Sequence, residues 1–233
     1  MVLLGGFYMK YAIRGGHTEL CTGCSGIINE LTENRKVKEA VIKYLKLAGE
    51  NVLDVTPPVK YTSEVKRDLA YGVDKANSWG ADMFISIHFN KAYSHYNGKL
   101  GTEVCVYSQH STAQRIVDKL GALGFKNRGQ KIRTELYELK HTKMKAVIVE
   151  VCFVEALGDV ELYKKLGADT IGKNIAEAII NKPIIIEKPK QPLYRVIVDG
   201  KQVGAYSELS NILNVIKKVS ATGFSEIEII RVW

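Results

Sequence analysis

The stretch RDLAYGVDKANSWGADMFISIHFN, Arg67–Asn90, decides the fold class of this 233-residue chain. Its first part continues an amphipathic helix that we expect from about Glu64 to Trp79. Its second part contains DMFISIHF, an apolar run that is typical of a buried strand. A helix that leads directly into a buried strand is characteristic of an α/β domain.

The same alternation of strands and helices extends in both directions along the chain. The other strand-like runs are YAIRG (11–15), NVLDV (51–55), TEVCVYS (102–108) and AVIVEVCF (146–153). Further helices are expected over about residues 30–48, 112–123 and 160–180. Asn29 is a suitable N-cap for the first of these helices, and Gly49 marks its end. The sequence therefore predicts an α/β domain with a mostly parallel sheet.

A proline-rich stretch, NKPIIIEKPKQP (181–192), separates this domain from a short tail. It holds three of the five prolines of the chain, and proline interrupts regular structure. We expect the main domain over residues 9–181, a linker over 182–192 and a small module over 193–233.

The tail predicts a ββαβ module. Asp199-Gly200, within LYRVIVDGKQVGAYS, suits the type I′ turn of a hairpin. Apolar residues then recur at the helical spacing 209, 212, 213 and 216, and SEIEIIRVW closes the chain with a strand. A module this short is near the lower size limit for independent folding.

The N-terminal sequence and the hydropathy limit the cellular setting. No apolar run approaches the roughly 18 to 20 residues that span a bilayer, so we expect no stable membrane insertion. The opening MVLLGGFYMK lacks the basic leader and cleavage site of a secretory signal, which predicts synthesis in the cytoplasm without a signal peptide. Gly-Gly-Phe-Tyr-Met (5–9) can be encoded by a ribosome-binding sequence, a short spacer and a start codon. Met9 is therefore an alternative to Met1 as the natural first residue.

The charge and the cysteines indicate partners and redox state. A net charge of +8 favours polyanions such as nucleic acid, anionic lipid or acidic wall polymers. The basic residues are scattered and no RNA-stacking motif is present, which argues against nucleic acid. Four cysteines in a chain of this length read as free thiols in a reducing compartment. The pair in CTGC, Cys21 and Cys24, lacks the second CxxC of a zinc ribbon, and loop packing is favoured over redox chemistry.

Polar residues stand where the predicted strands end. His17 follows YAIRGG, His88 lies in SIHFN, and Glu150 lies in VIVEV. Because ligands gather at the carboxyl edge of a parallel sheet, these side chains are expected to converge there. Glu30, in the first turn of the first helix, is expected to reach the same edge.

Two imidazoles and one carboxylate form a known catalytic zinc set, and a further carboxylate can take a proton from a water that the metal activates. His17, Glu30, His88 and Glu150 supply this number of groups. The alternative is that each is a hydrogen-bonded, partly buried polar residue. Spacing does not decide between the two, because the four residues share no short motif.

A family resemblance adds what spacing does not supply. The segments GGH (15–17), NE (29–30), the opening stretch, NRG (127–129) and AVIVEVCFVE (146–155) occur in that order. Together they resemble the zinc-dependent N-acetylmuramoyl-L-alanine amidases of the amidase-3 family, which include autolysins and endolysins of phages of Gram-positive, clostridial hosts. The resemblance covers roughly residues 9–180.

The resemblance implies His17, Glu30 and His88 as Zn²⁺ ligands and Glu150 as the catalytic glutamate. It also implies a sheet flanked by helices on both faces, and cleavage of peptidoglycan between the lactyl group of N-acetylmuramic acid and L-alanine. Two departures concern loop shape: Met144 stands where the family often has proline, and the first loop carries CTGC.

The expected function is that of a peptidoglycan hydrolase, a phage endolysin or an autolysin, which acts on the cell wall after release. Its partners are then peptidoglycan and anionic cell-wall polymers. One alternative is a zinc peptidase or carboxypeptidase that acts on the stem peptide. Another is a non-catalytic wall-binding protein whose metal site is structural or lost.

The tail is expected to bind the wall. Its pattern faintly resembles the small sporulation-related peptidoglycan-binding repeats. Tyr194, Tyr206, Phe224 and Trp233 are candidates for stacking on sugars, with core packing as the alternative role. So short a module also suggests self-association through the tail.

Overall fold

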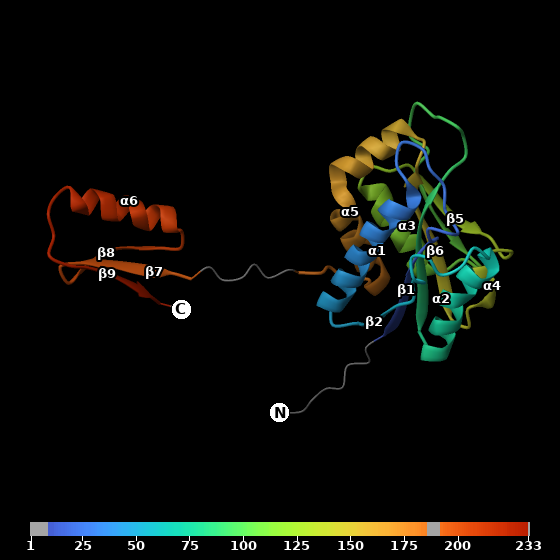
Figure 1. Ribbon diagram of the computed structural model, residues 1–233, viewed down its shortest axis with the longest axis horizontal. Helices are drawn as coiled ribbons and strands as arrows, with labels where there is room; N and C mark the ends of the chain where they lie inside the picture. The colour runs from blue at the N-terminus through green and yellow to red at the C-terminus, as the bar shows by residue number, and fades with distance from the viewer. Residues whose placement is uncertain (1–8, 186–191, 233) are drawn as a thin grey trace. The chain divides into compact units, whose positions relative to one another are not determined.

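The computed structural model describes residues 9–185 and 192–232, which form two compact units that separate after Ile184. Figure 1 shows the elements of each unit. Residues 1–8, most of the expected linker and Trp233 lie outside the described residues. The structure therefore does not address the choice between Met1 and Met9 as the first residue.

The first unit is built on a six-stranded sheet with strand order β2-β1-β3-β6-β4-β5. Its strands are β1 (Lys10–Gly15), β2 (Asn51–Asp54), β3 (Met83–Asn90), β4 (Thr102–Val106), β5 (Asn127–Ile132) and β6 (Lys145–Phe153). All neighbouring pairs are parallel except β4 and β6, which are antiparallel. A loop, and not a crossover helix, joins β3 to β4, so β4 runs in the reverse direction. The prediction of a mostly parallel sheet is confirmed.

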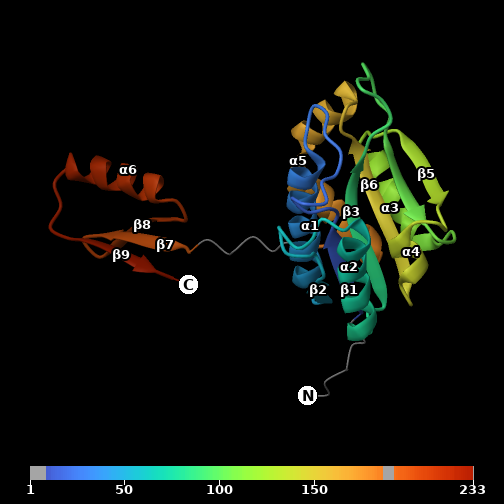
Figure 2. The same cartoon turned by 45° about the vertical axis from the view of Figure 1, so that its right-hand side comes forward.

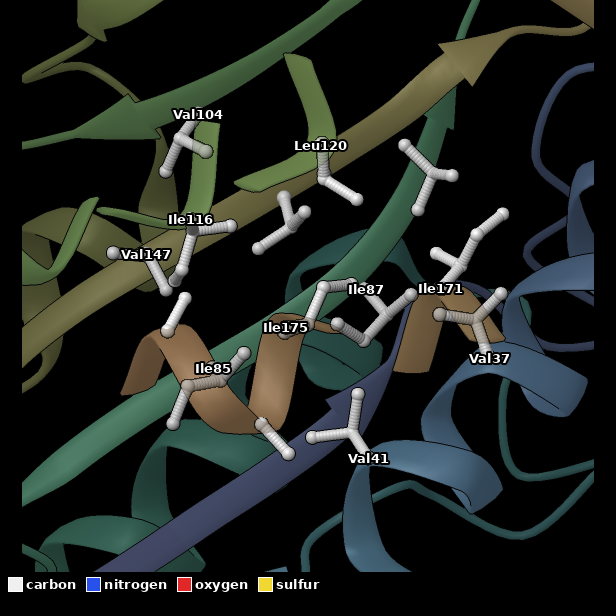
Figure 3. Close-up of a cluster of buried hydrophobic side chains, with 14 of the residues drawn as sticks. Val37, Val41, Ile85, Ile87, Val104, Ile116, Leu120, Val147, Ile171 and Ile175 are labelled. Carbon is white, nitrogen blue, oxygen red and sulfur yellow. The ribbon is translucent and has the colours of Figure 1, made fainter. Parts of the chain in front are cut away.

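Helices cover both faces of this sheet, as expected (Figures 1 and 2). One face carries α1 (Glu30–Leu47), α3 (Ser111–Ala122) and α5 (Leu157–Ile180), and the other carries α2 (Val65–Trp79) and α4 (Tyr137–His141). Alternation along β3 explains this arrangement. Ile85 and Ile87 point into the larger core shown in Figure 3, while Phe84 belongs to the core on the opposite face.

Several boundaries agree with the sequence pattern. Asn29 caps α1, and its side chain accepts the backbone N–H of Thr32 at 3.0 Å.

Other boundaries differ from the sequence pattern. The helix predicted over 160–180 starts earlier, at Leu157, and is broken at Gly167, whose backbone is left-handed with φ 77°. The sequence analysis did not anticipate β5 or α4.

The second unit is the predicted ββαβ module. It contains β7 (Tyr194–Val198), β8 (Lys201–Tyr206), α6 (Leu209–Ser220) and β9 (Ile227–Arg231), with strand order β8-β7-β9. Asp199 and Gly200 both have positive φ, 46° and 75°, which is the signature of a type I′ turn. Among its described residues only two hydrophobic side chains are buried, Val196 and Ile212.

Within the described residues, no helix is both long and apolar enough to span a membrane. The four cysteines are free thiols, as expected.

Candidate metal centre

Three of the predicted site residues meet at the carboxyl edge of β1 and β3. His17 follows β1, Glu30 opens α1, and His88 lies near the end of β3. Their potential ligand atoms all lie within 4.8 Å of one another. The Glu30 carboxylate stands between the imidazoles, with Oε1 3.0 Å from His88 Nδ1 and Oε2 3.3 Å from His17 Nε2.

Helix α1 fixes the loop that carries His17. The side chains of Asn34 and Arg35 each donate to the carbonyl of Gly16 at 2.9 Å, and Arg35 also donates to the carbonyl of His17. His17 adopts a positive φ of 64°, which is uncommon for a residue other than glycine. The contacts from α1 therefore hold a backbone conformation that the loop would not favour by itself.

Two glycines allow the close approach of these side chains. A Cβ added at Gly23 would lie 2.3 Å from Glu30 Oε2 and 2.6 Å from the His17 ring. A Cβ at Gly16 would lie 2.1 Å from the His88 ring. Any larger residue at either position would displace a ligand candidate.

Glu30 is held in its ionised form. Burial opposes ionisation, but hydrogen bonds with His17 and His88 outweigh it and hold the pKa of Glu30 well below its usual value. The backbone N–H groups of Cys24 and Phe89 add hydrogen bonds of 2.8 and 3.0 Å to the carboxylate. An anionic oxygen donor between two imidazoles is thus available to a cation.

Glu150 lies beside this group but is not part of it. On β6 it is in register with His88 of β3 and with Glu103 of β4. Its Oε2 is buried and has no hydrogen-bond partner among the described residues. Burial, followed by the negative charges of Glu30 and Glu103, raises the pKa of Glu150 to about 8. A carboxyl group with such a pKa is able to take up and release a proton near neutral pH.

A buried ionic cluster lies behind His88, and the sequence analysis missed it. Arg14 is fully buried and forms ion pairs with Asp68 at 2.6 Å and with Glu138 at 2.8 Å. Glu138 Oε2 is 3.9 Å from His88 Nε2. The signal in the sequence was an arginine within the apolar strand YAIRG, because a buried guanidinium requires a carboxylate partner.

The donor atoms of the centre fit a divalent cation. Glu30 is held ionised between the two imidazoles, and the three side chains each offer one ligand atom within 4.8 Å of the others. Two imidazoles and one carboxylate are also a donor set that suits zinc. The residues present therefore fit a metal of this class.

The cysteines of the CTGC loop make backbone contacts. Cys21 Sγ lies 3.1 Å from the carbonyl oxygen of Thr62, and Cys24 Sγ lies 3.4 Å from that of Phe89. Neither belongs to the candidate metal group found among the described residues. These contacts hold the loop against the segment that contains Thr62 and against β3.

Comparison with known proteins identifies the family of this chain. The family model described as N-acetylmuramoyl-L-alanine amidase, Amidase_3, matches residues 12–181, which is more than half of the chain. The chain belongs to this family. The amidase match contains all four candidate residues and does not include the second unit.

Two individual relatives differ in how much of their length this chain covers. An uncharacterised protein of Clostridium perfringens (strain 13 / Type A) is 51% identical over 181 residues, which are 76% of this chain and 53% of that protein. The chain therefore spans about half the length of this relative. The N-acetylmuramoyl-L-alanine amidase CwlM of Bacillus licheniformis is 27% identical over 232 residues, 96% of this chain and 85% of that one.

Among solved structures, the catalytic domain of the CD27L endolysin, which targets Clostridia difficile, superimposes with a TM-score of 0.70. It is 34% identical, and the match covers 76% of this chain and all of that domain. This likeness shows that the first unit has the fold of an amidase catalytic domain.

Proposed function

We propose that the first unit is a zinc-dependent amidase that hydrolyses the bond between the lactyl group of N-acetylmuramic acid and L-alanine in peptidoglycan. The observation that carries this proposal is the group of His17, Glu30 and His88 next to Glu150. Membership in the amidase family supports the substrate class.

His17, Glu30 and His88 are the residues that would hold the zinc ion. When bound, a zinc ion would supply Lewis acidity toward the amide carbonyl and an attacking water. Glu150 takes a proton from the attacking water, keeps it on its carboxyl group, and returns it to the leaving nitrogen of alanine.

A cavity beside the metal ligands offers space for the substrate. It has a volume of about 320 Å³ and is bordered by both histidines and by the apolar side chains of Leu20, Val65 and Leu69. Leu20 and Val65 are half or more exposed, so an incoming group would bury apolar surface there.

Wall digestion with identification of the new end group tests the proposal. A new N-terminal alanine supports the amidase. Any other new terminus supports a zinc peptidase or carboxypeptidase acting on the stem peptide, and no release supports a non-catalytic wall-binding protein. Chelation should abolish the release of fragments, and zinc should restore it.

We propose that the second unit is a wall-binding module. The enzyme would then act on the wall after the protein has left the cytoplasm. Its separation after Ile184 and its position outside the amidase match support a separate role. Phe224 is 40% exposed, whereas Tyr194 and Tyr206 are half-buried, so Phe224 is the better placed of these to stack on a sugar.

A fragment that ends after Ile184 tests this assignment, because Ile184 is buried in the core of the first unit. The fragment should cleave soluble muropeptides and bind walls and anionic wall polymers less tightly than the full chain. Equal wall binding would refute the module. Light scattering of the two proteins shows whether the tail also mediates self-association.

A further inference from the structure

We propose that Glu138 is a positioning residue that acts through Ser86 to orient the ring of His88, with Nδ1 directed at the metal. This inference rests on the proposed metal site. It assigns a function to the buried ionic cluster behind His88, which the catalytic residues do not use.

The two nitrogens of His88 have different partners. Nδ1 lies 3.0 Å from Glu30 Oε1, on the side where the ligand candidates meet. Nε2 lies 3.1 Å from the hydroxyl of Ser86. A neutral imidazole has one N–H group and one lone pair, so the partner of Nε2 decides which nitrogen is free to bind a cation.

Glu138 determines the direction of this hydrogen bond. The Ser86 hydroxyl lies 3.4 Å from Glu138 Oε1, and an ionised carboxylate only accepts hydrogen bonds. The hydroxyl therefore donates to Glu138, and its oxygen accepts the N–H from His88 Nε2. Without a cation, Nδ1 donates its own hydrogen bond to Glu30 Oε1. When a cation replaces that proton, the Ser86–Glu138 contacts keep the remaining N–H on Nε2 and leave the Nδ1 lone pair for the metal.

The members of the cluster are buried. Ser86 is fully buried, and the side chains of Arg14 and Glu138 are at most 2% exposed. Arg14 pairs with Glu138 at 2.8 Å, and Asp68 on α2 pairs with Arg14 from the other side at 2.6 Å. The Glu138 carboxylate is thus held by Arg14 on β1 and by Ser86 on β3.

Structural pairing alone does not account for Glu138. Arg14 and Asp68 already form a neutral buried pair, and a second carboxylate adds negative charge to the interior at a cost in stability. When a cation binds, a carboxylate behind a metal-ligating imidazole strengthens the metal–nitrogen bond, because the carboxylate orients the ring and increases the basicity of the ring. This gain offsets the cost in stability.

Metal affinity of the full chain tests the proposal. We expect Glu138→Leu to weaken zinc binding about 10- to 100-fold in a competition with a chromophoric chelator. Asp68→Asn is the matched control, because Asp68 also pairs with Arg14 but forms no hydrogen bond with His88 or Ser86 among the described residues. It should lower thermal stability and leave zinc affinity within about threefold. An equal loss in both variants would show a merely structural role and overturn the inference.

Two further measurements do not depend on how well the Glu138 variant folds. Ser86→Ala interrupts the same chain without removing a charge, and it should weaken zinc binding about 10-fold. Nitrogen-15 NMR of histidine in the zinc-loaded, unaltered protein should show a proton on His88 Nε2 and none on Nδ1. A proton on Nδ1 would refute the proposal. Because no assay uses substrate, a failure to cleave walls refutes the proposed function without affecting this result.

Discussion

The two units of the chain differ in what they bury. The first unit has a continuous apolar core between the sheet and α1, α3 and α5, and it also encloses Arg14, Glu30, Asp68 and Glu138. The second unit buries two hydrophobic side chains and, within its described residues, no charged one. Buried charge costs free energy, so it requires a core large enough to offset it. The difference is that the first unit encloses charged side chains in a large core, whereas the second unit presents mostly exposed side chains around a small one.

The largest expected effect concerns the division of roles in the first unit. Glu150→Gln keeps the size of the side chain but removes its ability to accept a proton. Wall hydrolysis should fall by about 10²- to 10⁴-fold, the usual contribution of a positioned general base, while the zinc content stays that of the unaltered protein. A turbidity assay on walls and metal analysis of the same sample measure both quantities.

Glu30→Ala is the matched variant, because Glu30 stands between the two imidazoles. It should lose zinc and activity together. If the Glu150 variant loses zinc and the Glu30 variant keeps it, the two roles are reversed. If both variants stay active, the catalytic site lies elsewhere.

Core substitutions test whether the units differ in stability as their cores suggest. Ile85→Ala should destabilise the first unit by about 2–5 kcal/mol. Val196→Ala should cost the second unit about 1.5–3 kcal/mol, the value of burying one valine, and this small unit should then unfold at ambient temperature. Calorimetry should show two transitions, each sensitive to one variant. A single transition shifted by both would contradict the division into independent units.

The smallest effect compares two glycines with positive φ, one in each unit. Gly167, with ψ 154°, is the more strained position for alanine. Gly167 and Gly200 have φ values of 77° and 75°, and an added Cβ at either meets no atom within 4 Å. Alanine at each position should therefore cost only backbone strain, about 1–3 kcal/mol. Gly167→Ala should leave the first unit folded, whereas Gly200→Ala should markedly increase amide hydrogen exchange in β7 and β8. Equal exchange in both variants would mean that the second unit has a larger stability reserve than its core indicates.

Much of the fold follows from local sequence signals. Apolar runs predicted β3 and β6, Asn29 marked the start of α1, and Asp199-Gly200 marked the hairpin of the second unit. These signals work because strand alternation, helix capping and type I′ turns depend on residues within a few positions of one another. Strand β5 was missed because NRGQKI, at the edge of the sheet, is polar and half-exposed.

The sequence by itself supplied the elements and, through the family resemblance, the list of candidate residues. Only the tertiary structure decided that His17, Glu30 and His88 come within 4.8 Å, that Glu150 lies in register with His88, and that Arg14 and Glu138 are paired behind it. The physical reason is that such contacts join residues far apart in the chain. Their geometry depends on strand order, on the packing of helices against the sheet and on the balance of buried charge, which no short segment determines.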